Sequence, residues 1–157
     1  LLALLARDAA TEVSQLEYLI SQPISPTEKL RLHIGGIIRA YHQFPYMNRL
    51  IHYLLHESGA EAADEVSKFF VAPLLEFHRR LLAEGVRCGE FRDIDPVLFY
   101  TSLIGACDHL FFGRHAMSRA TSSSFWIVSL IEARRPLRGA FISICIAFSD
   151  GASSAAS

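Results

Sequence analysis

Apolar residues recur every three or four positions through most of the chain, which is the period of an amphipathic α-helix. Glycine, serine or proline stands near each break between these runs, as expected at helix ends. We therefore predict an all-α fold, an antiparallel bundle of about six helices. The five helices predicted before the tail cover residues 1–21, 27–43, 45–58, 60–87 and 96–113.

Two strongly apolar runs are joined by the stretch AEGVRCGEFRDIDP, residues 83–96. Gly89 suits the position just past a helix end, where a positive φ is needed, and Phe91 follows where an apolar residue folds back on the last turn. Asp95 and Pro96 have the residue types of an N-cap and a first helical position. The stretch therefore predicts a helix–helix corner at the centre of the fold.

Three further features concern the helices themselves. Pro73 lies inside the run 60–87 and should kink it. The run 96–113 is apolar nearly all round, so it must be covered on several sides, one of them by a second subunit. The sequence Ser25-Pro26-Thr27-Glu28 matches a capping box that begins the second helix.

Composition is that of a globular domain, with 51% apolar and 20% charged residues. The formal net charge of −1 argues against nucleic-acid binding by this chain alone, because phosphate contacts need a basic face. The three cysteines are odd in number and form no CxxC pair, so we expect a reduced, cytoplasmic setting. No apolar run has the length of a membrane span, and no membrane partner is expected.

The character of the sequence changes after residue 118. We predict a helical domain over residues 1–118 and an atypical tail over 119–157, helical at first and then disordered. The apolar runs FWIVSLI and FISICIAF in the tail suit either helix or strand, and their periodicity does not decide. Leu1 already lies inside a helical pattern and is not methionine, so we expect the natural start to lie upstream.

Few residues suggest chemistry. His52 and His56 have the i, i+4 spacing of a helical metal site, but no cluster of acidic residues accompanies them, and solvated or pocket-lining histidines are the simpler interpretation. Asp108 and His109 are adjacent and do not face each other on a helix. No nucleophile is placed by any pattern, so we expect no enzyme, no catalytic residue, no metal and no cofactor.

Aromatic residues at helical spacing are more often core than cavity lining, and the spacing favours that interpretation here. The alternative is that these aromatic residues line an apolar ligand cavity with a few polar groups among them. The candidate polar groups are Arg49, His52, His78, Tyr100 and Ser102, and Cys107 is expected to be a buried thiol.

The run LLAEGVRCGEFRDIDPVLFYTSLIGACDHLFF resembles the ligand-binding domain of TetR-type transcriptional regulators. In that family a long helix ends in an xGxxxGxFRxxDP corner. The run PTEKLRLHIGGIIRAYHQFPYMNRLIHYLLHES looks like the two preceding helices, and the resemblance extends over about residues 1–118. The matching positions are Gly85, Gly89, Phe91, Arg92, Asp95 and Pro96 in the corner, with Gly105 and Phe111 after it.

The resemblance implies a homodimeric repressor domain that binds a small-molecule effector, with DNA contacted only through an N-terminal head absent from this chain. Effector binding would then be coupled to DNA release. The tail around Pro136 does not look like the family's final dimer helix. The candidate ligand-binding residues are Arg49, His52, Tyr53, Phe70, Leu74, His78, Tyr100, Ser102 and Cys107, and the candidate dimer-interface residues are Phe99, Leu103, Leu110 and Phe111.

Two other classes remain open. The first is an all-α metal-binding or enzymatic domain that uses His52, His56 and His78. The second is a helical interaction module with a solid core and no cavity. A filled interior among Phe70, His78 and Tyr100 would favour the second.

Overall fold

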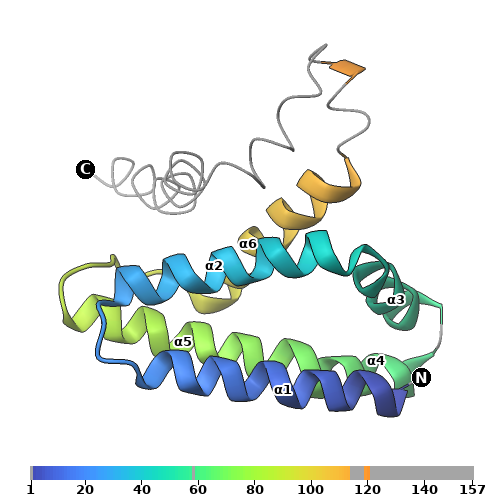
Figure 1. The fold of residues 1–157 in the computed structure, drawn as a ribbon, viewed down its shortest axis with the longest axis horizontal. Coiled ribbons are helices and arrows are strands. Elements are labelled where there is room, and N and C mark those ends of the chain that lie inside the picture. Colours follow the sequence, from blue (N-terminus) through green and yellow to red (C-terminus); the bar gives the residue numbers. More distant parts are fainter. Residues whose placement is uncertain (1, 58, 114–118, 121–157) are drawn as a thin grey trace.

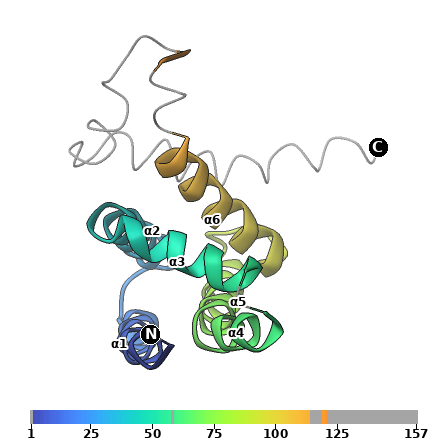
Figure 2. The same cartoon turned by 90° about the vertical axis from the view of Figure 1, so that its right-hand side faces the viewer.

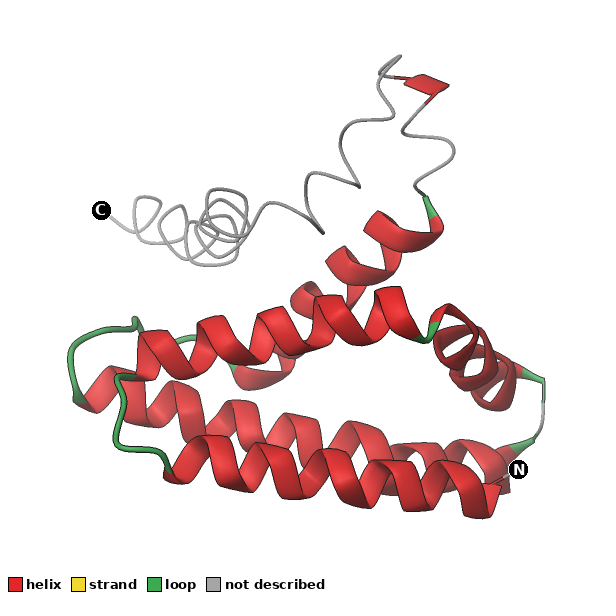
Figure 3. Ribbon diagram, in the orientation of Figure 1, coloured by secondary structure: helices red, strands yellow, loops and turns green. Residues whose placement is uncertain are grey.

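The computed structural model describes residues 2–57, 59–113 and 119–120, and these form an all-α bundle as predicted (Figures 1 and 3). Since α4, η1 and α5 follow one another without a break, this part of the chain contains five helices and not about six. The predicted tail beyond residue 120 lies outside the described residues. In chain order the segments are α1 (Leu2–Ser21), α2 (Pro26–Gln43), α3 (Pro45–His56), α4 (Ala60–Val66), the π-helical turn η1 (Ser67–Val71), α5 (Ala72–Arg87) and α6 (Pro96–Phe112).

Two helices begin as the sequence predicts. The Ser25 hydroxyl accepts a hydrogen bond from the Glu28 amide at 3.2 Å, and the Asp95 carboxylate accepts one from the Leu98 amide at 2.8 Å. A proline follows each cap, at a position whose N–H would lack a partner inside the helix. Local sequence therefore sets the N-termini of α2 and α6.

The corner between α5 and α6 also has the predicted form. Gly89 has a φ of +72°, and the amides of Glu90 and Phe91 donate to the Gly85 carbonyl at 2.8 and 3.1 Å. The Phe91 ring folds back so closely that a Cβ on Gly85 would lie 1.9 Å from Phe91 Cδ2. The Glu90 carboxylate accepts from the Thr27 amide at 2.9 Å, which joins the corner to the start of α2.

The effect of Pro73 is a widened turn. Directly before it, the Ala72 amide donates to the Ser67 carbonyl five residues back, which defines η1. Proline has no N–H, and its ring displaces the carbonyl four residues earlier, so a π-turn accommodates it while the helix continues. The kink predicted at this proline is thus a π-turn between α4 and α5.

Side-chain pairs show how the helices run. α2 is antiparallel to α5, because Lys29 meets Glu84 while His33 meets His78. α1 and α5 lie side by side and run in the same direction, because Glu17 meets Arg80 near the point where Lys29 joins Ile20 to Glu84 (Figure 1). α6 packs on α2 and α5 and crosses them obliquely (Figure 2).

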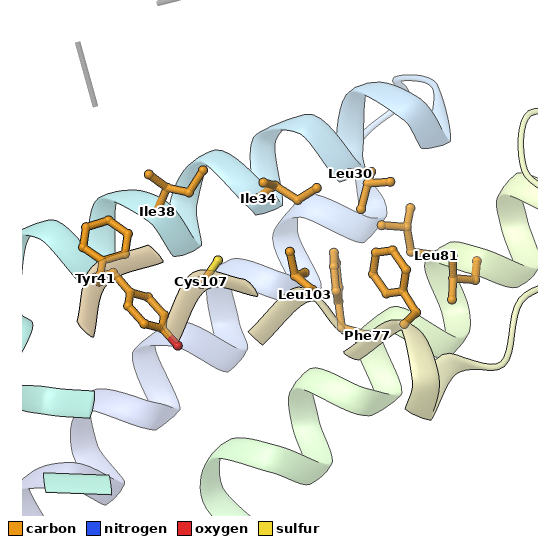
Figure 4. Packing of buried hydrophobic residues seen from close by; sticks show 11 residues of the cluster. Leu30, Ile34, Ile38, Tyr41, Phe77, Leu81, Leu103 and Cys107 are labelled. Carbon is orange, nitrogen blue, oxygen red and sulfur yellow. The ribbon is translucent and has the colours of Figure 1, made fainter. Parts of the chain in front are cut away.

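The main core lies between α2, α5 and α6 (Figure 4). A smaller cluster joins α3 to α4 around Leu54, Ala62 and Val66. The main core consists mostly of aliphatic and aromatic residues, and its eleven members are Leu30, Ile34, Ile38, Tyr41, Phe77, Leu81, Leu82, Phe99, Leu103, Cys107 and Phe111.

Candidate functional site

Two histidines face each other inside the main core. His33 of α2 is 5% exposed and His78 of α5 is not exposed at all. Their Nε2 atoms are 2.8 Å apart, which is a hydrogen-bonding distance. His33 lies within the buried stripe of α2, between Leu30 and Ile34, so the helical spacing itself directs it inward.

Aromatic rings surround this histidine pair. The centroid of the His78 ring lies 5.1 Å from that of Phe99, 5.8 Å from Phe77 and 5.9 Å from Tyr100. The centroid of the His33 ring lies 4.6 Å from that of Phe77. Phe77 and Phe99 are buried and Tyr100 is half-buried, so the two polar rings lie in apolar surroundings that exclude bulk water.

Burial keeps both imidazoles neutral. It lowers the pKa of His33 to about 3, with a further decrease from the neighbouring His78, and it lowers the pKa of His78 to about 4. Since two facing nitrogens can share only one proton, one Nε2 must donate and the other must accept. The pair therefore contains one histidine protonated at Nε2 and one protonated at Nδ1.

The other nitrogen of His78 is chemically the most distinctive atom of the site. His78 Nδ1 is buried and has no hydrogen-bond partner among the described residues. Leaving a buried polar atom in this state costs about 1–3 kcal/mol. Buried groups of this kind need an explanation, such as strain, a chemical role or a bound water or ion.

A second polar chain joins three helices near one end of the core. The Tyr41 hydroxyl of α2 donates to Asp108 Oδ1 of α6 at 2.7 Å, and His52 Nε2 of α3 lies 3.1 Å from Asp108 Oδ2. Burial, and then the charge of Asp108, raise the pKa of Tyr100. This Tyr41–Asp108–His52 chain holds α3, which otherwise packs in the smaller cluster, against the main core.

The buried ammonium group of Lys29 connects α1 to α2 and α5. Lys29 of α2 is 3% exposed, and its Nζ donates to Glu84 of α5 at 2.8 Å and to the Ile20 carbonyl near the end of α1 at 2.8 Å. On the surface, Arg80 of α5 donates to Glu17 of α1 at 2.6 Å. The helix that carries His78 is thus tied to α1 at two points.

The structure separates the nine predicted ligand-binding residues. His78 and Tyr100 lie together, with Cys107 buried in the same core and Leu74 half-buried one turn before His78. Phe70 packs instead against the smaller cluster, so it does not join them. The exposed residues of the set are Arg49, His52, Tyr53 and Ser102.

The predicted dimer-interface residues of α6 face inward in this chain. Phe99, Leu103 and Phe111 are buried in the core of their own subunit, and Leu110 is half-buried against it. Because α6 is apolar nearly all round, periodicity did not show which side faces inward. The outward apolar residues of α6 are Val97, Leu98 and Phe112, which are 52%, 63% and 41% exposed.

The candidate site predicted from the sequence left out four of the polar residues described above: Lys29, His33, Tyr41 and Asp108, the last considered only beside its neighbour His109. A signal was present for His33 and Tyr41, because both continue the apolar stripe of α2. Lys29 and Asp108 gave no signal, since an ionised residue on a helix is ordinarily solvated.

Other chemistry finds little support. The His52 and His56 rings stack with centroids 6.3 Å apart, and no group of three or more metal-ligating side chains occurs in the part of the chain that the structure describes. Among the described helices, none is both long and apolar enough to cross a membrane.

Fold and site together define an all-α domain with a hydrogen-bonding pair enclosed between three helices. The family model described as "Tetracyclin repressor-like, C-terminal domain" matches residues 23–124, which is more than half of the chain. The chain therefore belongs to the TetR-like C-terminal domain family. Comparison with curated proteins gives no significant match.

Proposed function

We propose that this chain is the effector-binding and dimerisation domain of a TetR-family transcriptional repressor. The family match over residues 23–124 is the observation that carries the proposal, since domains of this family generally dimerise and bind small molecules. A regulatory role of this kind is not enzymatic, and it belongs in the cytoplasm, where the DNA is. DNA contact is assigned to a separate head of the same regulator.

The ties between helices suggest how binding is transmitted. α5 carries His78 toward the core and Arg80 toward Glu17 of α1. A small molecule that favours one packing of α2, α5 and α6 therefore also favours one position of α1, which leads toward the head. Such a two-state change can couple effector binding to DNA release.

The test is a thermal-shift screen of the domain against uncharged and charged small molecules, followed by DNA titration of the whole gene product with each hit. We expect a hit that weakens DNA binding, and DNA must weaken binding of that hit by the same factor. Tight binding that leaves DNA affinity unchanged would contradict the proposal and favour an interaction module.

A further inference from the structure

We propose that the effector is an uncharged, largely apolar molecule with one hydroxyl or carbonyl group, and that His78 Nδ1 is the atom that binds this group. The inference rests on the proposed function and specifies the chemistry of its ligand. Its starting point is the placement of a fully buried imidazole whose second nitrogen has no partner within the described residues.

The hydrogen bond between the two histidines determines what Nδ1 can do. When His78 Nε2 donates to His33, His78 Nδ1 holds a lone pair and accepts from a ligand hydroxyl. When His33 Nε2 donates, His78 Nδ1 carries the proton and donates to a ligand carbonyl or hydroxyl. A hydroxyl fits both arrangements and a carbonyl fits one, so both groups are compatible with the pair.

The charged side chains near the core already have partners, which disfavours an ionic effector at His78. The buried ammonium of Lys29 is already engaged by Glu84 and the Ile20 carbonyl, and Asp108 is engaged by Tyr41 and His52. A carboxylate or an amine next to His78 would therefore be buried without a counter-charge from the described residues, which is strongly unfavourable. Both histidines are also held neutral, so neither supplies the positive charge that an anion needs.

The rings around His78 suit the body of such a ligand. Phe77, Phe99 and Tyr100 present aromatic surfaces within 5.1 to 5.9 Å of the His78 ring. Tyr100 is the half-buried member of the three, so this ring marks the side of the site that is nearest to solvent. Apolar contact would then supply affinity, and the single polar contact would supply orientation.

The experiment uses four probes on one phenylbutyl body, which ends in a hydroxyl, a methyl ketone, a carboxylate or an amine. Their dissociation constants are measured by calorimetry on the domain, and imidazole ¹⁵N shifts are recorded with and without the alcohol. We expect the alcohol and the ketone to bind at least about tenfold more tightly than the charged probes, since an unpaired buried charge costs more than a hydrogen bond returns. The alcohol should shift the Nδ1 resonance of His78.

Two variants localise the effect. His78→Leu should weaken binding of the alcohol about tenfold, while His42→Leu, an exposed position on α2, should leave it unchanged. If His78→Leu does not fold, the ¹⁵N shift in the unaltered protein still decides.

Tighter binding of a charged probe, no binding of either neutral probe, or binding that leaves His78 Nδ1 unshifted would overturn the inference. Such a result leaves the proposed function standing if some compound still changes DNA affinity. The proposed function fails separately if compounds bind and DNA affinity never responds.

Discussion

At the scale of single residues, the feature that matters most is the hydrogen bond between the buried side chains of His33 and His78. A neutral hydrogen bond contributes only about 0.5–1.5 kcal/mol of net stability, whereas a buried nitrogen that loses its partner costs about 1–3 kcal/mol. The His33–His78 pair is therefore a weak source of stability and a strong constraint on each partner.

A double-mutant cycle tests this constraint. His33→Leu should lower the free energy of unfolding by about 1–3 kcal/mol, because it leaves His78 Nε2 buried without a partner, and His78→Leu should lower it less, because it also removes the unpaired Nδ1. The double variant should lose less than the sum, since it removes both polar groups. Urea unfolding measures the three values, and additive losses would mean that the two rings do not interact.

The same pair makes a pH prediction. Both pKa values are lowered on folding, to about 3 and about 4, so below the ordinary value near 6.5 the unfolded chain binds more protons than the native state. Stability is therefore complete above about pH 6.5 and decreases as the pH falls toward 4. Between pH 7 and pH 5 each histidine should account for a loss of about 2 kcal/mol.

The control for this prediction is the double leucine variant, whose unfolding free energy should depend less steeply on pH over the same range. The His52–Asp108 and Lys29–Glu84 pairs are retained in both proteins, so the difference between the two profiles isolates the buried pair. Parallel profiles would show that these histidines titrate as they do in water.

At the scale of elements, the corner between α5 and α6 depends on one missing side chain. A Cβ on Gly85 would lie 1.9 Å from the Phe91 ring, so Gly85→Ala must displace that ring or break the turn. We expect a loss of about 2–3 kcal/mol in chemical unfolding, in the range of other overpacked sites.

Gly36→Ala is the matched control, because a Cβ there would meet only the end of Arg39 at 4.0 Å. It should stabilise α2 by about 0.5–1 kcal/mol through helix propensity. Equal effects of the two alanines would contradict the packing described at the corner.

Elements were more predictable from the sequence than the site. Caps such as Asp95 and the turn at Gly89 are encoded by a few neighbouring residues, so the helix starts and the corner could be foreseen. The inward side of α6 and the partner of His78 depend on contacts between distant helices. His78 and Tyr100 were identified from their residue types alone, whereas His33 was overlooked although it continues the apolar stripe of α2.

At the scale of the whole molecule, the exposed apolar side of α6 is where we expect a second copy. Leu98 is 63% exposed and makes little contribution to its own core, so Leu98→Asp should leave folding intact and place a charge in the dimer interface. In sedimentation experiments, we expect the dissociation constant of the dimer to be at least about tenfold larger for this variant than for the unaltered protein.

Leu32→Asp is the control, since Leu32 is 46% exposed and belongs to a different helix, α2. It should sediment like the unaltered protein. A dimer that survives Leu98→Asp, or that is lost equally in both variants, would place the interface elsewhere.

The central claim is that a neutral, proton-sharing histidine pair lies inside the bundle, and imidazole ¹⁵N spectroscopy of the labelled domain tests it most directly. Of the seven histidines, two should remain neutral at pH 5, one protonated at Nε2 and the other at Nδ1. If instead all seven gain a proton together near pH 6.5, the pair is not buried as described and the proposed anchor for the ligand does not exist.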